Sequence, residues 1–243
     1  MMVVEETITL PAGARATRLI PRQRTESSPL DHAVRYAQER AWDVFPGTWL
    51  EADAGVPRCS CGASGCTAPG AHPARRDWSG EVTGSATTAR RLWAERPRAA
   101  VLLPTGRAFD ALEVPQMAGC LALARLERTA RTAPAGSAAT ATAAPGPVTC
   151  TPDGRMVFFV LPGTAPRLAD AVRKLGHSPG ALPLTVRGEG DWVAAPPTRL
   201  GTRGSVQWAR QPTAANRWLP DATELLPALV YACYATGATA PAG

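Results

Sequence analysis

The spacing of apolar and polar positions predicts helices interspersed with strands. Ser28 is a favourable helix-capping residue, and the apolar positions after it recur every three or four residues, which predicts a helix through Ala41. The same signals predict further helices at 85–93, 117–130, 168–175 and 221–234. Short apolar runs bounded by turn residues predict strands at 43–46, 99–103, 109–114, 148–151, 156–161, 182–187, 192–195 and 206–208.

Three short turns separate pairs of these strands. They are Thr105-Gly106-Arg107, Pro152-Asp153-Gly154 and Gly188-Glu189-Gly190, and each predicts two strands joined by a turn. The order of elements lacks the regular strand-helix alternation of a doubly wound parallel sheet. It predicts an α+β fold with a mixed or antiparallel sheet and flanking helices, gathered on one face of that sheet.

The chain divides into one main folded region with less regular ends. Residues 1–27 have little apolar periodicity and predict a flexible leader, and 28–220 hold the main domain. Within it, 132–147 is almost entirely Ala, Thr, Gly and Pro, which predicts a flexible insertion. Residues 221–243 are expected to form a C-terminal helix and tail.

Composition and charge narrow the classes of function. A hydrophobic share of 45% with seven Trp is typical of a folded protein. The net charge of +6 favours an anionic partner such as DNA, but Lys174 is the only lysine among many arginines, so ordinary surface arginine remains an alternative. No apolar run is long enough to span a bilayer and no secretory leader is recognisable, so a cytoplasmic protein with no membrane partner is expected.

The loop 57–73 carries the strongest chemical signal. Cys59, Cys61, Cys66 and His72 fall within fourteen positions, among glycines that allow a tight backbone. Three thiolates and one imidazole suit a closed tetrahedral Zn²⁺ site, which has a structural role because no coordination position is left open. A cysteine-containing loop without metal and a redox pair at Cys59 and Cys61 are the alternatives.

Several ordered segments resemble one family. They are Ala33-Val34-Arg35-Tyr36-Ala37, Trp42-Asp43-Val44-Phe45-Pro46, the Cys-rich loop with Pro69-Gly70-Ala71-His72-Pro73, Trp78, Trp93, Pro97, Ala100-Val101-Leu102-Leu103-Pro104-Thr105-Gly106, Val186 to Pro197, Gly204 and Trp208. Together they resemble the N-terminal domain of bifunctional DNA primase/polymerases, of the archaeo-eukaryotic primase type, over about residues 30–220. The resemblance implies an RRM-like sheet that binds template and nucleotide and joins nucleotides with two divalent metal ions.

The positions that the resemblance assigns to catalysis have lost their expected side chains. Glu113 and Pro115 stand where two metal-bridging carboxylates are implied, and proline offers no ligand atom. Met156 stands at the implied histidine, and Thr185 at the implied third carboxylate. Asp110 lies three residues before Glu113, so a strand would point the two carboxylates to opposite faces. The resemblance therefore predicts a degenerate copy without polymerase activity, which would use Mg²⁺ or Mn²⁺ only if active.

Three arginines are candidates for binding nucleotide or nucleic acid. Arg155, Arg187 and Arg199 carry guanidinium groups suited to phosphate, although surface arginine is an equal alternative. The first functional hypothesis is an inactive primase/polymerase-like domain that binds nucleic acid, nucleotide or a protein partner. The second is an active nucleotidyltransferase with displaced carboxylates, for which Glu189 and Asp191 are candidates, although their place beside a glycine turn favours solvated hairpin charges. The third is a structural or regulatory interaction protein.

Overall fold

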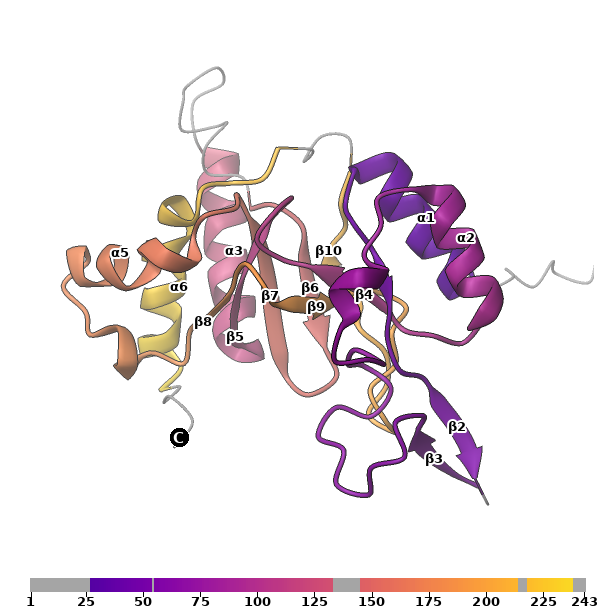
Figure 1. Cartoon of the computed structure of the whole chain (residues 1–243). Coiled ribbons are helices and arrows are strands. Elements are labelled where there is room, and N and C mark those ends of the chain that lie inside the picture. Colours follow the sequence, from indigo (N-terminus) through magenta and orange to yellow (C-terminus); the bar gives the residue numbers. More distant parts are fainter. Residues whose placement is uncertain (1–26, 54, 133–144, 214–217, 238–243) are drawn as a thin grey trace, which may run out of the picture.

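The centre of the molecule is a five-stranded antiparallel sheet (Figure 1). The computed structural model describes residues 27–53, 55–132, 145–213 and 218–237. Residues 148–151 and 155–160 form a hairpin whose turn needs Gly154, because its φ of +82° is disfavoured for other residues. The strand order is β10 (Gln207–Arg210), β6 (Val148–Thr151), β7 (Arg155–Val160), β5 (Asp110–Pro115) and β8 (Thr185–Arg187).

Three helices cover one face of this sheet. They are α3 (Gln116–Thr132), α5 (Leu168–Lys174) and α6 (Ala222–Ala235). Their apolar side chains pack with Leu112, Val114 and Phe158 in one buried cluster. Helix α3 can approach β7 closely because Gly119 has no side chain: a Cβ there would lie 2.6 Å from the Met156 Cβ.

The opposite face is half covered by a second layer. This layer consists of the sheet β1 (Phe45–Pro46), β4 (Val101–Pro104) and β9 (Trp192–Ala194), with helices α1 (Pro29–Arg40) and α2 (Ala86–Glu95). Trp42 stacks on Phe159 of β7 at 5.2 Å between ring centroids, and Phe109 packs beside both rings. The other half of this face, beyond Val157 toward the β6–β7 turn, is not covered by the second layer and carries polar side chains.

The expectation that the helices gather on one face of the sheet is wrong. Helices lie on both sides of the five-stranded sheet, with α1 and α2 on the side away from α3 and α6 (Figure 1). The strands predicted at 99–103/109–114 and 182–187/192–195 are present, but the two strands of each set do not pair with each other, since β4 and β9 belong to the smaller sheet while β5 and β8 belong to the larger one. Each turn instead carries the chain from one sheet to the other.

These two crossing turns are bonded to each other. Thr105 donates its backbone N–H to the Asp191 carbonyl at 3.0 Å and its hydroxyl to the Gly188 carbonyl at 2.6 Å. A Cβ at Gly106 would lie 2.3 Å from the Glu189 Cα, so this close approach requires glycine. Two segments 83 residues apart therefore meet where the two sheets join.

The predicted first helix and the loop region are both observed. Ser28 and Asp31 form a reciprocal capping box at the start of α1. Beyond the two sheets, β2 (Leu50–Asp53) and β3 (Val56–Cys59) form a separate hairpin that leads into the Cys-rich loop. Short 3₁₀ turns occupy Trp78–Glu81, Ala165–Arg167 and Pro179–Ala181.

Parts of the sequence-based expectations lie outside the described residues. These are nearly all of the predicted leader, most of the 132–147 insertion and the end of the C-terminal tail. Within the described ranges, no helix has both the length and the apolar character needed to cross a membrane.

Candidate functional site

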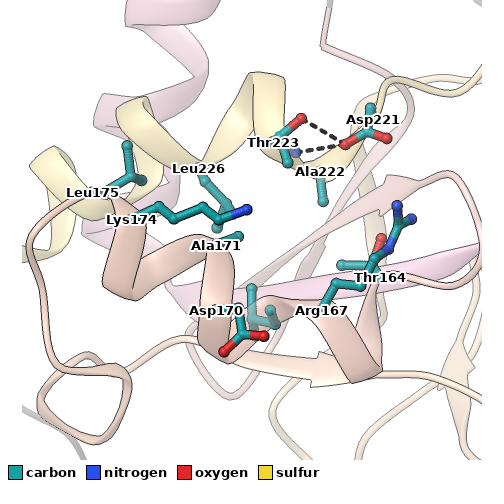
Figure 2. A pocket seen from close by; sticks show the side chains of 11 residues that line it. Thr164, Arg167, Asp170, Ala171, Lys174, Leu175, Asp221, Ala222, Thr223 and Leu226 are labelled. Carbon is teal, nitrogen blue, oxygen red and sulfur yellow. Dashed lines mark hydrogen bonds between the residues drawn. The ribbon is translucent and has the colours of Figure 1, made fainter.

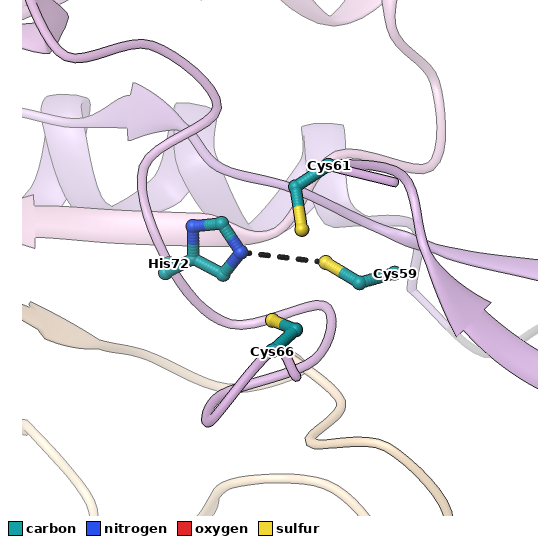
Figure 3. Close-up of side chains that lie close together, drawn as sticks. All are labelled: Cys59, Cys61, Cys66 and His72. Carbon is teal, nitrogen blue, oxygen red and sulfur yellow. Dashed lines mark hydrogen bonds between the residues drawn. The ribbon is translucent and has the colours of Figure 1, made fainter. Parts of the chain in front are cut away.

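The four metal-ligand candidates converge in space (Figure 3). The ligand atoms of Cys59, Cys61, Cys66 and His72 all lie within 4.8 Å of one another. The Cys59 Sγ and His72 Nε2 are 3.4 Å apart. Tetrahedral zinc with bonds of about 2.3 Å to sulfur would hold its sulfur ligands about 3.8 Å apart, so the spacing fits such an ion without a large rearrangement.

The surrounding backbone orients these ligands. Cys59 ends β3, and its sulfur accepts the Gly70 N–H at 3.3 Å. The His72 Nδ1 lies 2.8 Å from the Pro73 carbonyl oxygen, so Nδ1 carries the proton and Nε2 is free to bind a metal. Thr48 holds His72 through both its backbone and its side chain. Its N–H donates to the His72 carbonyl at 2.8 Å, and its hydroxyl donates to the same carbonyl and accepts the His72 N–H.

Hydrogen bonding also prepares Cys59 for coordination. Burial alone would raise the pKa of its thiol, but the N–H groups of Cys61 and Gly70 and the hydroxyl of Thr48 outweigh that effect and lower the pKa to about 6. Burial raises the pKa of the Cys66 thiol to about 11. One thiol is therefore ready to ionise, whereas the other needs the charge of a bound cation.

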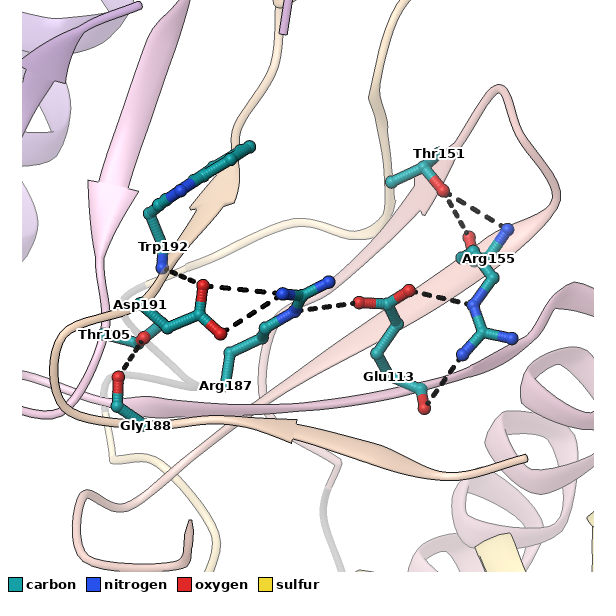
Figure 4. A network of polar contacts seen from close by, with 8 residues as sticks. All are labelled: Thr105, Glu113, Thr151, Arg155, Arg187, Gly188, Asp191 and Trp192. Atoms are coloured by element: carbon teal, nitrogen blue, oxygen red, sulfur yellow. Dashed lines mark hydrogen bonds and ion pairs between the residues drawn. The ribbon is translucent and has the colours of Figure 1, made fainter. Parts of the chain in front are cut away.

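The open half of the large sheet holds a row of alternating charges (Figure 4). Glu113 on β5 accepts a hydrogen bond from the Arg155 Nε at 2.8 Å and another from the Arg187 Nε at 3.3 Å. The two guanidinium groups approach from the neighbouring strands β7 and β8 and occupy one carboxylate oxygen each. The Glu113 side chain is 16% exposed, so this carboxylate is largely shielded from solvent.

Asp191 extends the row toward the smaller sheet. Its carboxylate accepts from the Arg187 Nη1 at 3.2 Å and from the Trp192 backbone N–H at 2.9 Å. Burial would lower the pKa of Arg187, but Glu113 and Asp191 outweigh it and raise that pKa, so the guanidinium stays charged. The row holds two carboxylates and two guanidiniums, and its charges balance.

The pairing register decides which candidate residues share this cleft. Pro115 lies opposite Arg155, and Thr185 lies opposite Glu113, so both are on the cleft face. Among the residues of β5, β7 and β8 on that face, Glu113 is the single acid.

Met156 does not lie in the cleft. It pairs with Val114 and is 1% exposed beneath α3, on the helix-covered face of the sheet. A histidine placed at 156 would therefore point into the apolar core. Arg155 and Val157 are the β7 residues that face the cleft beside Glu113.

Arg199 is also separate from the other two arginines. It forms an isolated bridge with Ser205 and lines a groove of about 970 Å³ between α1, the β2–β3 hairpin and the segment 196–208. The lining of that groove includes neither Arg155 nor Arg187.

Asp110 proves to be a structural residue. It is 1% exposed, and its Oδ2 accepts the backbone N–H groups of Thr164 and Ala165 at 2.7 and 3.1 Å. This places it on the face opposite Glu113, as the strand alternation predicts. Sequence inspection gave no sign that Asp110 joins β5 to the segment before α5, because its partners lie more than 50 residues away.

A smaller cavity of about 390 Å³ lies between α5 and the start of α6 (Figure 2). Its charged lining residues are Arg167, Lys174, Asp170 and Asp221, so positive and negative groups balance. Asp221 already caps α6 by accepting the Thr223 N–H at 2.8 Å. This cavity contains none of the residues that the sequence suggested.

Comparison with known proteins supports the sequence resemblance. No curated protein matches the chain. A family model described as "Bifunctional DNA primase/polymerase, N-terminal" matches residues 33–221, which include both crossing turns, the metal-ligand cluster and the charged cleft. The chain belongs to this bifunctional DNA primase/polymerase N-terminal family.

Proposed function

We propose that this protein is a catalytically silent member of its family that binds nucleic acid or nucleotide without joining nucleotides. The observation that carries the proposal is the state of Glu113. Its two carboxylate oxygens are each bonded to an arginine, and no second acid lies beside it on the described cleft strands.

Two-metal nucleotidyl transfer needs a group that can bridge two cations. Carboxylates held close together supply this, and the metals then stabilise the charge that develops on the transferring phosphoryl group. A cation that bound to Glu113 would have to displace the two guanidiniums that already bond its carboxylate oxygens. Electrostatic repulsion therefore opposes binding at the position where catalysis would need it.

The retained fold and the arginines support a binding role. Arg187 is 41% exposed and could exchange its carboxylate partners for a phosphate group. We also propose that the Cys-rich loop holds zinc as a structural ion, since its three sulfurs and one imidazole leave no open coordination position.

Primer extension with Mg²⁺ and Mn²⁺ tests catalytic silence. The zinc-loaded protein should give no extension above a protein-free blank with either metal, and the Glu113→Gln and Glu189→Gln variants should give none either. Metal-dependent extension by the wild type that disappears in Glu113→Gln or in Glu189→Gln would show an active enzyme and refute the proposal.

A further inference from the structure

The groove that contains Arg199 has the composition of a stacking site. Trp49, Trp208 and His32 each contribute partly buried aromatic rings to its lining. Trp208 is held in place because its ring packs edge-on against Tyr36 at 6.1 Å and lies 5.6 Å from Phe159. An aromatic face fixed in this way loses little conformational entropy when a ligand stacks on it.

Cationic groups lie beside these rings. Arg199 is exposed, and Arg98 has a side chain that is 64% exposed. The acidic lining residue Glu51 is already engaged, because it accepts the Trp49 Nε1–H at 3.0 Å and pairs with Arg98 at 3.8 Å. The groove therefore presents aromatic surface and net positive charge.

The metal-ligand loop and the segment 196–208 form a common floor. A Cβ at Gly70 would lie 2.8 Å from Leu50 and 3.1 Å from the Arg199 carbonyl oxygen, so these three segments are in close contact. Gly201 donates its N–H to the Pro69 carbonyl at 2.8 Å. On the opposite wall, the Tyr36 hydroxyl donates to the Pro196 carbonyl at 2.8 Å and ties α1 to the same segment.

We propose that this groove, distinct from the cleft around Glu113, binds a short stretch of single-stranded nucleic acid. Unpaired bases would stack on Trp49, and Arg199 would contact the phosphate backbone. Bases in a duplex are already stacked on each other, so this chemistry selects single strands. The proposal rests on the proposed binding function and gives it a location and a ligand class.

Size and charge favour a nucleic-acid strand over a peptide. The volume of about 970 Å³ is near the upper end of small-ligand pockets, so it admits a few nucleotides and excludes a double helix. The protein carries a net charge of +6, which attracts a polyanion over distances that a neutral peptide would not feel.

Fluorescence anisotropy with a labelled oligothymidylate tests the proposal on the full zinc-loaded chain. Trp49→Ala should weaken binding by about 5- to 100-fold, the range associated with loss of one stacked base. The matched control is Trp218→Ala, because Trp218 is 86% exposed and lies outside the groove. This control should leave affinity unchanged.

Two arginine variants test the groove by the salt dependence of binding and leave Trp49 unchanged. Arg199→Ala should lower the slope of log affinity against log salt by about 0.7, the value for one phosphate contact on a single strand. Arg203→Ala removes an exposed arginine of the same segment outside the groove lining and should leave the slope unchanged. A change in Arg199→Ala alone supports the groove even if Trp49→Ala proves unstable.

The outcomes separate this inference from the proposed function. Wild-type binding that is lost in Arg187→Ala but kept in the Trp49 and Arg199 variants would overturn the groove and leave a nucleic-acid-binding cleft. Absence of any binding to oligothymidylate, or its displacement by an uncharged proline-rich peptide at equal concentration, would overturn the ligand class. Neither result bears on catalytic silence, which primer extension measures independently.

Discussion

The Cys-rich loop has the grouped ligands that a metal site requires, whereas the charged cleft does not. In the loop, four ligand atoms of the right chemical types converge within 4.8 Å. In the cleft, Glu113, which is the single acid on the cleft face of β5, β7 and β8, is bonded to two arginines. A structural ion stabilises the fold even when no reaction is catalysed. Catalytic carboxylates that bind no metal, by contrast, leave an unbalanced negative charge. The arginines at Glu113 balance the charge of its carboxylate.

The largest expected effect comes from the loop. Cys61→Ser should abolish stoichiometric zinc and lower the free energy of unfolding by about 4 kcal/mol or more, as loss of a structural metal typically does. For a domain of this size, that corresponds to a fall in Tm of about 8 to 16 °C. Metal analysis and thermal melting measure the two quantities on the same sample.

The control for this prediction is Cys120→Ser, which removes an exposed thiol outside the loop. It should leave both zinc content and Tm unchanged. If Cys61→Ser keeps its metal and its Tm, the loop is not a structural zinc site, and the contrast with the cleft disappears.

An intermediate effect is expected at the cleft. Glu113→Gln removes the charge that two guanidiniums share, and it should lower the free energy of unfolding by about 2 kcal/mol, a typical value for charge-assisted hydrogen bonds. Urea denaturation measures the change, and Glu189→Gln serves as an exposed control. A Glu113→Gln variant as stable as the wild type would mean that the row of charges does not hold the cleft together.

A smaller effect is expected at α6, which covers the rear of the large sheet. The N–H and hydroxyl of Thr223 lower the pKa of Asp221, so its capping contribution is present above the ordinary aspartate pKa and is lost as pH falls through the lower folded pKa. Asp221→Ala should therefore cost about 1 kcal/mol at pH 7 and progressively less below pH 4.

Asp221→Asn is the matched variant, because asparagine can cap the helix at every pH. It should retain most of the stability and flatten the pH dependence. Equal losses in the alanine and asparagine variants across the pH range would show that the cap is not the source of the effect.

The smallest effect is expected when a second acid is introduced into the cleft. Thr185→Asp places a second acid opposite Glu113, beside an arginine that is already charged. We expect stability within about 0.5 kcal/mol of the wild type, as for other exposed substitutions, and no measurable Mn²⁺ binding. Strong Mn²⁺ binding by this single variant would mean that the arginines do not block the cleft.

Local sequence patterns predicted most of the secondary structure and the convergence of the four ligand candidates in the loop. The four ligand candidates lie within fourteen positions, so their convergence needs only a tight loop. The bonds of Glu113 to Arg155 and Arg187 span 42 and 74 residues, and no local pattern encodes them. They depend on the placement of β5 between β7 and β8, which tertiary packing decides.

The expectations that differ from the structure also depend on tertiary packing, which local sequence does not encode. Met156 was expected at a catalytic position, but strand register turns it toward α3, and a shift of one residue reverses the face of every side chain. The turns at Thr105 and Gly188 resemble hairpin turns in sequence. Their hydrogen bonds to each other, which local sequence does not reveal, direct the flanking strands into different sheets.

The central claim is that the cleft no longer holds catalytic cations, and a Mn²⁺ titration in the presence of a deoxynucleoside triphosphate tests it most directly. Electron paramagnetic resonance of the zinc-loaded wild type and of Glu113→Gln should give identical isotherms, with all bound Mn²⁺ accounted for by the nucleotide's own phosphates. Two protein-bound Mn²⁺ ions per chain in the wild type that are lost in Glu113→Gln would contradict the account.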